Sequence, residues 1–352
     1  MDRLPLSKDI ETKTVVKKLT LAHRALAELK GIVSIIPNDI ILINTLGIQE
    51  AKDSSAIENI ITTHDDLYKA ELNFDNFQEP NTKEVQSYIA ALKKGFSLIS
   101  ESGMLTINDI LEIQSVLEKN DAGFRKVSGT VLRNSTTGKI IYTPPQDYKT
   151  ILDLMSNLES YINNDSLCGL DPLVKVAVIH YQFESIHPFY DGNGRTGRII
   201  NILYLVMKGL LDIPVLYLSR YIIERKMEYY RLLQEVRDTG NWENWLLFIL
   251  DAIEQTSKET IVLIKDIHIN MLELKHKIRA GYKFYSRELL NNLFKHPYTK
   301  IEFLENDLGV SRITAANYLN KLAQDGILKK EKLKTGNYYV NWKLFELLTR
   351  KR

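Results

Sequence analysis

The chain has 352 residues, 44% of them hydrophobic, and a formal net charge of +2. The length suggests two or three domains with real cores, and the charge indicates no particular partner. A single cysteine, Cys168, excludes an internal disulfide framework and fits a reducing compartment.

No stretch approaches the roughly 18–20 apolar residues of a membrane helix. The N-terminus also lacks the apolar region of a secretory signal peptide. We therefore expect a cytoplasmic protein without a membrane partner.

The first part of the chain is predicted to be helical. Apolar residues in 11–30 recur at alternating spacings of four and three, which is the period of a helix. A second helical pattern covers about 38–50, and amphipathic segments follow at 82–100 and 105–118. Together they indicate a mainly α fold.

The segment 51–60 contains two polar residues on one predicted helix face. Ser54 and Glu58 are four positions apart, so their side chains neighbour each other on a helix. On residue types alone, the ordinary interpretation is the start of a surface helix.

A hairpin is predicted in this otherwise helical chain. Residues 131–133 and 139–142 are strand-like, and the polar run Asn134 to Gly138 separates them. Taken alone, it could be an incidental ribbon.

The segment 186–198, IHPFYDGNGRTGR, concentrates polar chemistry between two predicted helices, 173–186 and 199–207. A short loop that ends at a helix N-terminus favours anions, because the unpaired backbone N–H groups and the helix dipole both attract negative charge. We expect an anion site here.

Each residue type in this loop suits a polyphosphate. Gly192 and Gly194 allow positive φ and a close approach of the backbone to an anion. Asn193 can donate a hydrogen bond to a phosphate oxygen. Arg195 and Arg198, three apart on one helix face, offer planar guanidinium groups that match phosphate.

Two further side chains fit the chemistry of phosphate transfer. Asp191 supplies the oxygen ligand that Mg²⁺ prefers alongside substrate phosphates. His187 precedes the glycines and could take a proton from an incoming hydroxyl. A lone histidine before a proline is, however, more often an ordinary loop residue.

The spacing Gly192-x-Gly194-x-x-Gly197 also spells the dinucleotide-binding fingerprint. That fingerprint requires a strand running directly into the first glycine, and the nearest strand-like run, 174–179, ends well before it. No Walker A sequence occurs either. Rossmann and P-loop interpretations are therefore rejected.

The segment matches, without a gap, the HPFx[D/E]GNGRxxR signature of Fic-domain proteins. The resemblance implies an enzyme that transfers AMP from ATP to a Ser, Thr or Tyr hydroxyl of a target protein. It implies His187 as the catalytic base and Asp191 as the ligand of Mg²⁺. The implied ATP-binding residues are Glu58, His187, Gly192, Asn193, Gly194, Arg195, Thr196, Gly197, Arg198 and Tyr230.

One position departs from the family near the implied adenine pocket. In the family, the helix expected at 219–236 borders that pocket, which implies a base contact for Tyr230. Many relatives have Asn seven residues beyond this tyrosine, where this chain has Arg237.

A second motif resembles the family's inhibitory helix, whose pattern is [S/T]xxxE[G/N]. Ser54, Glu58 and Asn59 match it, in a helix expected at about 47–61. By resemblance Glu58 pairs with Arg198 and takes the place of the ATP γ-phosphate. ATP could then bind only with its α-phosphate misaligned for attack. The family also uses the hairpin as a flap that holds the target by strand addition.

The tail, 281–352, is basic, with 14 Lys and Arg against 7 Asp and Glu. Predicted helices at 289–294, 300–306 and 311–322 precede a hairpin around 329–336, and this order resembles a winged helix-turn-helix. Groove contacts to DNA would come from Arg312, Thr314 and Asn317, and phosphate contacts from Lys329, Lys330, Lys332 and Lys334. Winged helices also serve as protein-interaction modules, and that alternative stays open.

These patterns predict three parts. An N-terminal helical region (1–104) carries the inhibitory helix, a Fic catalytic core (105–278) carries the flap, and a winged helix domain (279–352) follows. The leading function is a protein adenylyltransferase that also modifies itself and is autoinhibited by Glu58. The alternatives are removal of AMP using Glu58, or a DNA-binding regulator whose core senses nucleotide. By analogy with the family, a homodimer is also kept as an option.

Overall fold

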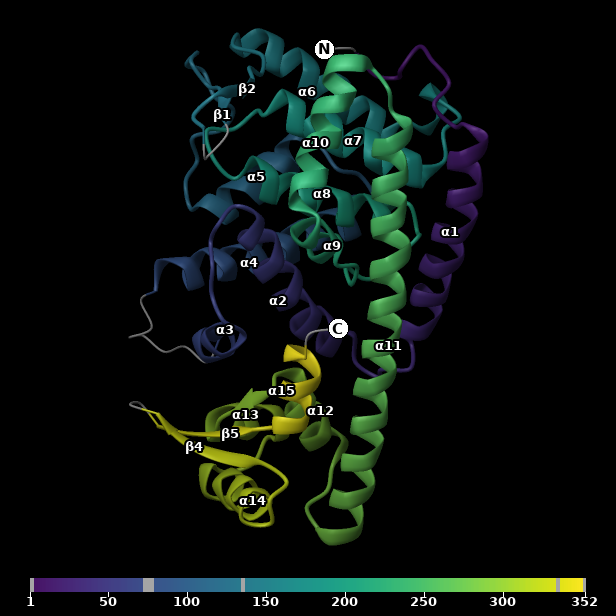
Figure 1. The fold of residues 1–352 in the computed structure, drawn as a ribbon. Helices are drawn as coiled ribbons and strands as arrows, with labels where there is room; N and C mark the ends of the chain where they lie inside the picture. The colour runs from purple at the N-terminus through teal and green to yellow at the C-terminus, as the bar shows by residue number, and fades with distance from the viewer. Residues whose placement is uncertain (1–2, 72–78, 134–136, 334–335, 351–352) are drawn as a thin grey trace.

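The computed structural model describes residues 3–71, 79–133, 137–333 and 336–350, and it is mainly α-helical as predicted (Figure 1). The predicted hairpin residues Asn134 to Thr136 and the predicted DNA contact Lys334 lie outside these ranges. No helix in the described ranges combines the length and apolar content needed to cross a membrane.

The N-terminal region is built from helices, some of which have polar side-chain caps. They are α1 (Lys13–Val33), α2 (Asp39–Ile57), α3 (His64–Glu71), α4 (Pro80–Ser102) and α5 (Ile107–Glu118). Asn38 caps α2, and Thr106 with Asp109 forms a capping box on α5.

The segment around Ser54 is the end of α2 and does not start a new surface helix. No Gly or Pro interrupts the chain after residue 50, so α2 continues to Ile57 and buries Ser54 completely. The helix ends at Glu58, and Asn59 adopts the left-handed conformation with φ 64°. The polar face thus points into the protein.

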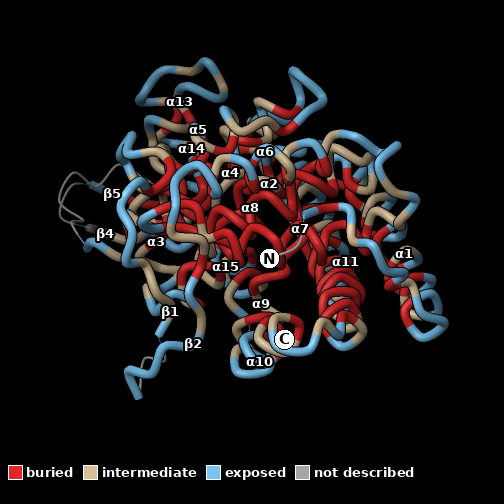
Figure 2. Tube along the Cα trace, turned by 90° about the horizontal axis from the view of Figure 1, so that it is seen from above, coloured by how far each residue is buried: buried red, intermediate tan, exposed pale blue. Residues whose placement is uncertain are grey.

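The centre of the molecule is a helix pair that carries the motif loop. The core elements are α6 (Tyr148–Asn163), a short 3₁₀ turn (Asp165–Leu167), α7 (Pro172–Ile186) and α8 (Asn193–Met207). Every residue of α7 from Leu173 onward is buried, which is typical of a helix covered on all sides, and it lies among the red central segments of Figure 2.

The segment predicted as one helix at 219–236 forms two helices. α9 (Leu218–Glu224) and α10 (Lys226–Thr239) meet at Arg225, whose φ of −121° interrupts the helical path. The long α11 (Glu243–Gly281) follows and packs side by side with α1 (Figure 1). The break at Arg225 has no Gly or Pro to signal it.

The predicted hairpin is present as a short antiparallel pair, β1 (Leu132–Arg133) with β2 (Ile140–Tyr142). It projects from the surface near α5 (Figure 1). Tyr142 ties its base to the core, because its hydroxyl donates to the carbonyl of Ser185 at 3.0 Å.

The C-terminal unit sits against the lower half of α11 in Figure 1. It contains α12 (Arg287–Lys295), β3 (Tyr298–Thr299), α13 (Ile301–Leu308), α14 (Arg312–Gln324), β4 (Lys329–Leu333), β5 (Gly336–Val340) and α15 (Trp342–Thr349). The strands form an antiparallel sheet in the order β3-β5-β4. Both α12 and α15 pack against α2, which places this unit beside the helix that carries Glu58.

Candidate active site

His187 stands at the point where α7 ends and the motif loop begins. It adopts the left-handed conformation, with φ 48° and ψ 59°, and its backbone N–H still bonds to the carbonyl of Phe183 at 2.9 Å. Burial, together with the guanidinium groups of Arg125 and Arg237, lowers the pKa of His187 to about 4. The imidazole is therefore neutral near pH 7, the form that a base requires.

The Asn193 side chain bonds to the backbone of its own loop, and its contact with a phosphate stays a prediction. Its Oδ1 accepts from the Phe189 N–H at 2.8 Å, and its Nδ2 donates to the Phe189 carbonyl at 2.9 Å. Both ends of the amide are thus used to close the loop. The Asn193 side chain therefore holds the backbone of the loop that forms the predicted anion site.

Arg198 and the end of α2 form a buried cluster. The Arg198 Nε donates to Ser54 Oγ at 2.8 Å, and its Nη2 donates to the Ser54 carbonyl at 3.0 Å and to Glu58 Oε1 at 2.8 Å. The Arg198 side chain is 1% exposed and that of Glu58 is 35% exposed. Burial alone would raise the pKa of Glu58, but the Arg198 charge and hydrogen bond hold it below its usual value.

The Glu58 carboxylate occupies the space above Gly194. A Cβ atom added to Gly194 would lie 2.2 Å from Glu58 Oε1 and 3.1 Å from Arg198 Nη1. Only a residue without a side chain permits this approach. The anion that lies against the loop and the start of α8 is thus the Glu58 carboxylate of the protein itself.

Arg195 does not join Arg198 at this anion. Its Nη2 lies 2.8 Å from Glu118 Oε1 and its Nη1 3.2 Å from Glu84 Oε2, and the side chain is almost fully buried. The two arginines are three apart, yet they serve different carboxylates. Arg198 therefore lies at the start of α8 beside Glu58, whereas Arg195 is engaged elsewhere, and the binding of ATP phosphates by either residue stays a prediction.

Asp191 is exposed at the mouth of the loop. Its Oδ1 accepts from the Gly192 N–H at 2.7 Å. Gly192 has φ 76°, and a Cβ there would lie 2.3 Å from Glu118 Oε1. The described residues contain no group of three or more metal ligands. An exposed single carboxylate nevertheless fits Mg²⁺, which is often held by one or two carboxylates together with substrate phosphates.

Gly197 and Thr196 face the interior. A Cβ on Gly197 would lie 3.0 Å from both Glu184 Oε1 and Phe183 Cδ1, so this glycine allows α8 to approach α7 closely. Thr196 is fully buried, and its Oγ1 has no hydrogen-bond partner in the described ranges. Both residues therefore pack inside the protein, and their ATP contacts stay predictions.

Tyr230 and Arg237 border the site from α10. Tyr230 is 44% exposed, while its neighbour Tyr229 is buried and its hydroxyl lies 2.8 Å from His180 Nε2. Arg237 stacks on the ring of Tyr142, with its guanidinium carbon 3.9 Å from the ring centroid. Arg237 therefore links α10 to the base of the hairpin.

Sequence reasoning assigned no role to three residues around His187. Burial raises the pKa of Glu184 to about 7, and its Oε1 has no hydrogen-bond partner in the described part of the chain. The hydroxyl of Tyr190 accepts from the N–H groups of Lys126 at 2.8 Å and Val127 at 3.3 Å. Arg125 binds the motif loop directly. In the sequence, Arg125 is marked only by its place in the run Gly123-Phe124-Arg125, shortly before the predicted hairpin.

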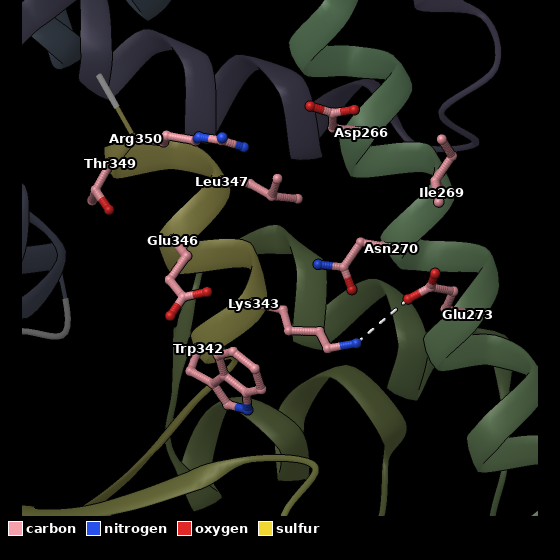
Figure 3. Close-up of a pocket in the computed structure, with 10 residues that line it drawn as sticks. All are labelled: Asp266, Ile269, Asn270, Glu273, Trp342, Lys343, Glu346, Leu347, Thr349 and Arg350. Atoms are coloured by element: carbon pink, nitrogen blue, oxygen red, sulfur yellow. Dashed lines mark hydrogen bonds and ion pairs between the residues drawn. The ribbon is translucent and has the colours of Figure 1, made fainter. Parts of the chain in front are cut away.

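A cavity of about 750 Å³ lies far from this site, between α11 and α15 (Figure 3). Its lining includes Ile269, Asn270, Trp342 and Leu347, and Lys343 reaches Glu273 across it at 3.4 Å. None of the predicted site residues lines this groove.

Three family models match the chain. They are the Fic/DOC family N-terminal model over residues 16–97, the Fic/DOC family model over 104–205, and the C-terminal domain model of SoFic-like protein adenylyltransferase over 271–344.

Curated relatives and solved structures agree with these models. The chain is 30% identical over 175 residues to protein adenylyltransferase Fic of Aedes aegypti, covering 49% of this chain and 33% of that protein. It is 28% identical over 178 residues to protein adenylyltransferase fic-1 of Caenorhabditis elegans, covering 50% and 33%. The chain thus spans about a third of the length of these relatives.

Two solved structures share the fold. A Fic family protein from Desulfovibrio desulfuricans G20 gives a TM-score of 0.60 at 22% identity, covering 94% of this chain and 96% of that one. Fic-1 from C. elegans gives 0.54 at 21% identity, covering 72% and 73%. These likenesses show the fold, and the two Fic/DOC models, over residues 16–97 and 104–205, show that the chain belongs to the Fic/DOC family.

Proposed function

We propose that this protein transfers AMP from ATP to a hydroxyl side chain of a target protein and of itself. The observation that carries the proposal is the Glu58 carboxylate, which lies above Gly194 and pairs with Arg198. A helix N-terminus with a buried guanidinium group is built for a phosphate. The names of the relatives, protein adenylyltransferases, support ATP as the source of that phosphate.

The reaction follows from the placement of His187 beside this anion site. The neutral imidazole takes the proton of the target hydroxyl, and the resulting oxygen attacks the α-phosphorus of ATP. A new phosphate ester bond forms, the bond to the β-phosphate breaks, and pyrophosphate leaves. The backbone N–H groups of the loop and Arg198 bind the phosphates, so catalysis depends on positioning and charge neutralisation.

Asp191 is the residue that would hold Mg²⁺. The ion would supply charge neutralisation on the α- and β-phosphates. The base of the hairpin, anchored through Tyr142, would present an edge for the target backbone.

Glu58 would restrain this activity. Its carboxylate stands where the γ-phosphate needs Arg198, so ATP would bind with its α-phosphorus out of line. A second candidate function uses the same residue: the partly exposed Glu58 could orient a water that removes AMP from a modified protein. The observation in favour is that Glu58 lies close enough to His187 to affect the pKa of the imidazole.

The C-terminal unit is proposed to be a winged helix that binds DNA. The order of its helices and strands supports this proposal, and Arg312 and Asn317 are exposed on α14. The strand β4 exposes Lys329, Lys330 and Lys332 beside it. A homodimer and a cytoplasmic location remain proposals from family analogy and from the single cysteine.

Incubation with ATP labelled at the α-phosphate separates the alternatives. Label that becomes covalently attached to protein supports transfer, and loss of pre-attached label supports removal. Neither outcome, together with a mobility shift of duplex DNA, would support the DNA-binding regulator.

A further inference from the structure

Arg125 is a buried cation that has no carboxylate partner among the described residues. The residue is 1% exposed, and its side chain donates only to backbone carbonyls: Nε to His187 at 2.8 Å, and Nη2 to Ile186 at 3.3 Å and to Pro145. Taking a guanidinium group out of water without a counter-ion is unfavourable. Its presence here indicates a task beyond packing.

The first part of that task concerns the backbone of His187. The left-handed conformation is unusual for a residue with a side chain and persists only where the surroundings hold it. The carbonyls at the end of α7 also lack partners within the helix. Arg125 satisfies those of Ile186 and His187, and its own N–H bonds to the Pro188 carbonyl at 2.8 Å.

The second part concerns the hairpin. Pro145 lies three residues beyond the hairpin strand β2, and its carbonyl accepts a hydrogen bond from the same Nη2 group that donates to Ile186. The Arg125 side chain therefore connects the turn at Ile186 and His187 with the segment after β2 that contains Pro145. Lysine, a point charge with a single nitrogen, cannot reproduce this fork.

The third part is electrostatic. The pKa of His187 responds to the charges of Arg125 in the loop before β1, Arg237 on α10 and Glu58 at the end of α2, and to the backbone of Glu184 on α7 itself. After burial, Arg125 has the largest effect in lowering the pKa of the imidazole. Removing its charge should allow the imidazole to protonate at higher pH.

We propose that Arg125 is a positioning residue that fixes the His187 imidazole against the target hydroxyl and ties the flap to it. Its side chain acts through the backbone carbonyls of His187, Ile186 and Pro145. The inference rests on the proposed adenylyl transfer, and it adds a residue that the motif does not contain.

The test compares Arg125→Met and Arg125→Lys in a Glu58→Gly background, where transfer is not restrained. Arg24→Met, at an exposed site on α1, is the matched control. Label transfer from α-labelled ATP is measured between about pH 5 and pH 8, and ATP affinity is measured by calorimetry. His187→Ala is run in parallel.

Both Arg125 variants should lower kcat by about 10- to 100-fold, the scale of a misplacement of about 1 Å, and should leave ATP affinity unchanged. In Arg125→Met the rate should also fall as the pH approaches about 5, because the imidazole then protonates more readily. Arg125→Lys keeps the charge and should keep the flat profile of the Arg24→Met control. If Arg125→Met fails to fold, the comparison of Arg125→Lys with the control still tests the inference.

Unchanged kcat in both Arg125 variants, with His187→Ala inactive, would overturn the inference alone. Full activity of His187→Ala would instead overturn the proposed role of His187 in transfer.

A different set of contacts links the C-terminal unit to the segment that carries Glu58. Upstream of Glu58, Gln49 donates from Nε2 to the carbonyl of Leu348 at 2.9 Å. Downstream, the hydroxyl of Tyr298 donates to Asp65, and Tyr68 stacks on the Tyr298 ring at 6.3 Å. The C-terminal unit thus contacts the chain both before and after Glu58 in the sequence.

We infer that the C-terminal unit holds α2 and α3 in the position that places Glu58 on Arg198. A partner that loosens this contact would release the restraint. The inference rests on the proposed inhibitory role, so its test includes a readout that needs no catalysis: hydrogen exchange of the backbone at residues 54–58.

The test variant is Gln49→Ala combined with Asp65→Ala, and the control is Lys343→Ala, which breaks a contact to α11. The double variant should exchange faster at 54–58 and incorporate more label than the parent. It should give no further gain in the Glu58→Gly background. Exchange equal to that of the control would overturn the coupling, whether or not the protein transfers AMP.

Discussion

Replacing Glu58 with glycine should release the enzyme, and the structure bounds the size of the effect. The variant loses one charge-assisted hydrogen bond to Arg198 and keeps both bonds to Ser54. Such a bond contributes roughly 1.5–3 kcal/mol. Because the Glu58 side chain is 35% exposed, solvent screening reduces this to about 1–2 kcal/mol.

The expected gain in label incorporation is therefore about 5- to 30-fold at one ATP concentration, since about 1.4 kcal/mol corresponds to a factor of ten. Glu58→Gln should give a smaller gain, because the amide still fills the space above Gly194 and can still accept a bond from Arg198. Adding Arg198→Ala to Glu58→Gly should lower incorporation again, since the freed guanidinium is what binds the γ-phosphate.

The assay is covalent incorporation from α-labelled ATP by parent, single and double variants, with removal of pre-attached AMP measured alongside. Equal incorporation by parent and Glu58→Gly would refute the inhibitory role. A loss of AMP removal in that variant would instead identify Glu58 as a hydrolytic residue.

Three further predictions follow from other residues of the described structure. His187→Ala should abolish transfer and leave ATP binding intact in calorimetry, because the imidazole acts on the hydroxyl; transfer near the parent rate would exclude it as the base. Burial raises the pKa of Glu184 from its ordinary value of 4.5 to about 7, so burying this carboxyl group destabilises the fold increasingly as the pH rises between these values. The thermal stability of Glu184→Gln relative to the parent should accordingly grow over that range, and a constant difference would contradict the assignment. If the C-terminal unit binds DNA, affinity should fall steeply with salt, and replacing Lys329, Lys330 and Lys332 with Ala should flatten the slope; no duplex binding at low salt would leave a protein-interaction module.

The motif loop could be recognised from the sequence because its chemistry is local. Helical periodicity on either side and the glycines at 192 and 194 were enough to predict a loop that ends at the start of α8. The resemblance of Ser54 and Glu58 to the family's inhibitory motif added a distant partner for Arg198, and the structure brings these residues together.

The roles of individual side chains in the loop could not be predicted in the same way. Arg195 turns to Glu84 and Glu118, which lie 111 and 77 positions away in the chain. Spacing along α8 says which face a residue occupies but not which carboxylates other helices bring there. The Asn193 amide likewise bonds to the Phe189 backbone, and only the folded loop reveals that acceptor and donor.

Arg125 illustrates the same limit. Its partners are backbone carbonyls, which every residue carries, so no sequence pattern marks them. The boundary between α9 and α10 was missed because no helix-breaking residue stands at Arg225.

The most direct test of adenylyl transfer is tandem mass spectrometry of the Glu58→Gly protein and of a cell lysate treated with it and ATP. The account predicts AMP attached through a phosphate ester to Ser, Thr or Tyr side chains. It also predicts that the same adducts are absent when His187→Ala is added to the variant. If Glu58→Gly binds ATP and yields no AMP adduct on itself or on any lysate protein, the proposed activity is wrong.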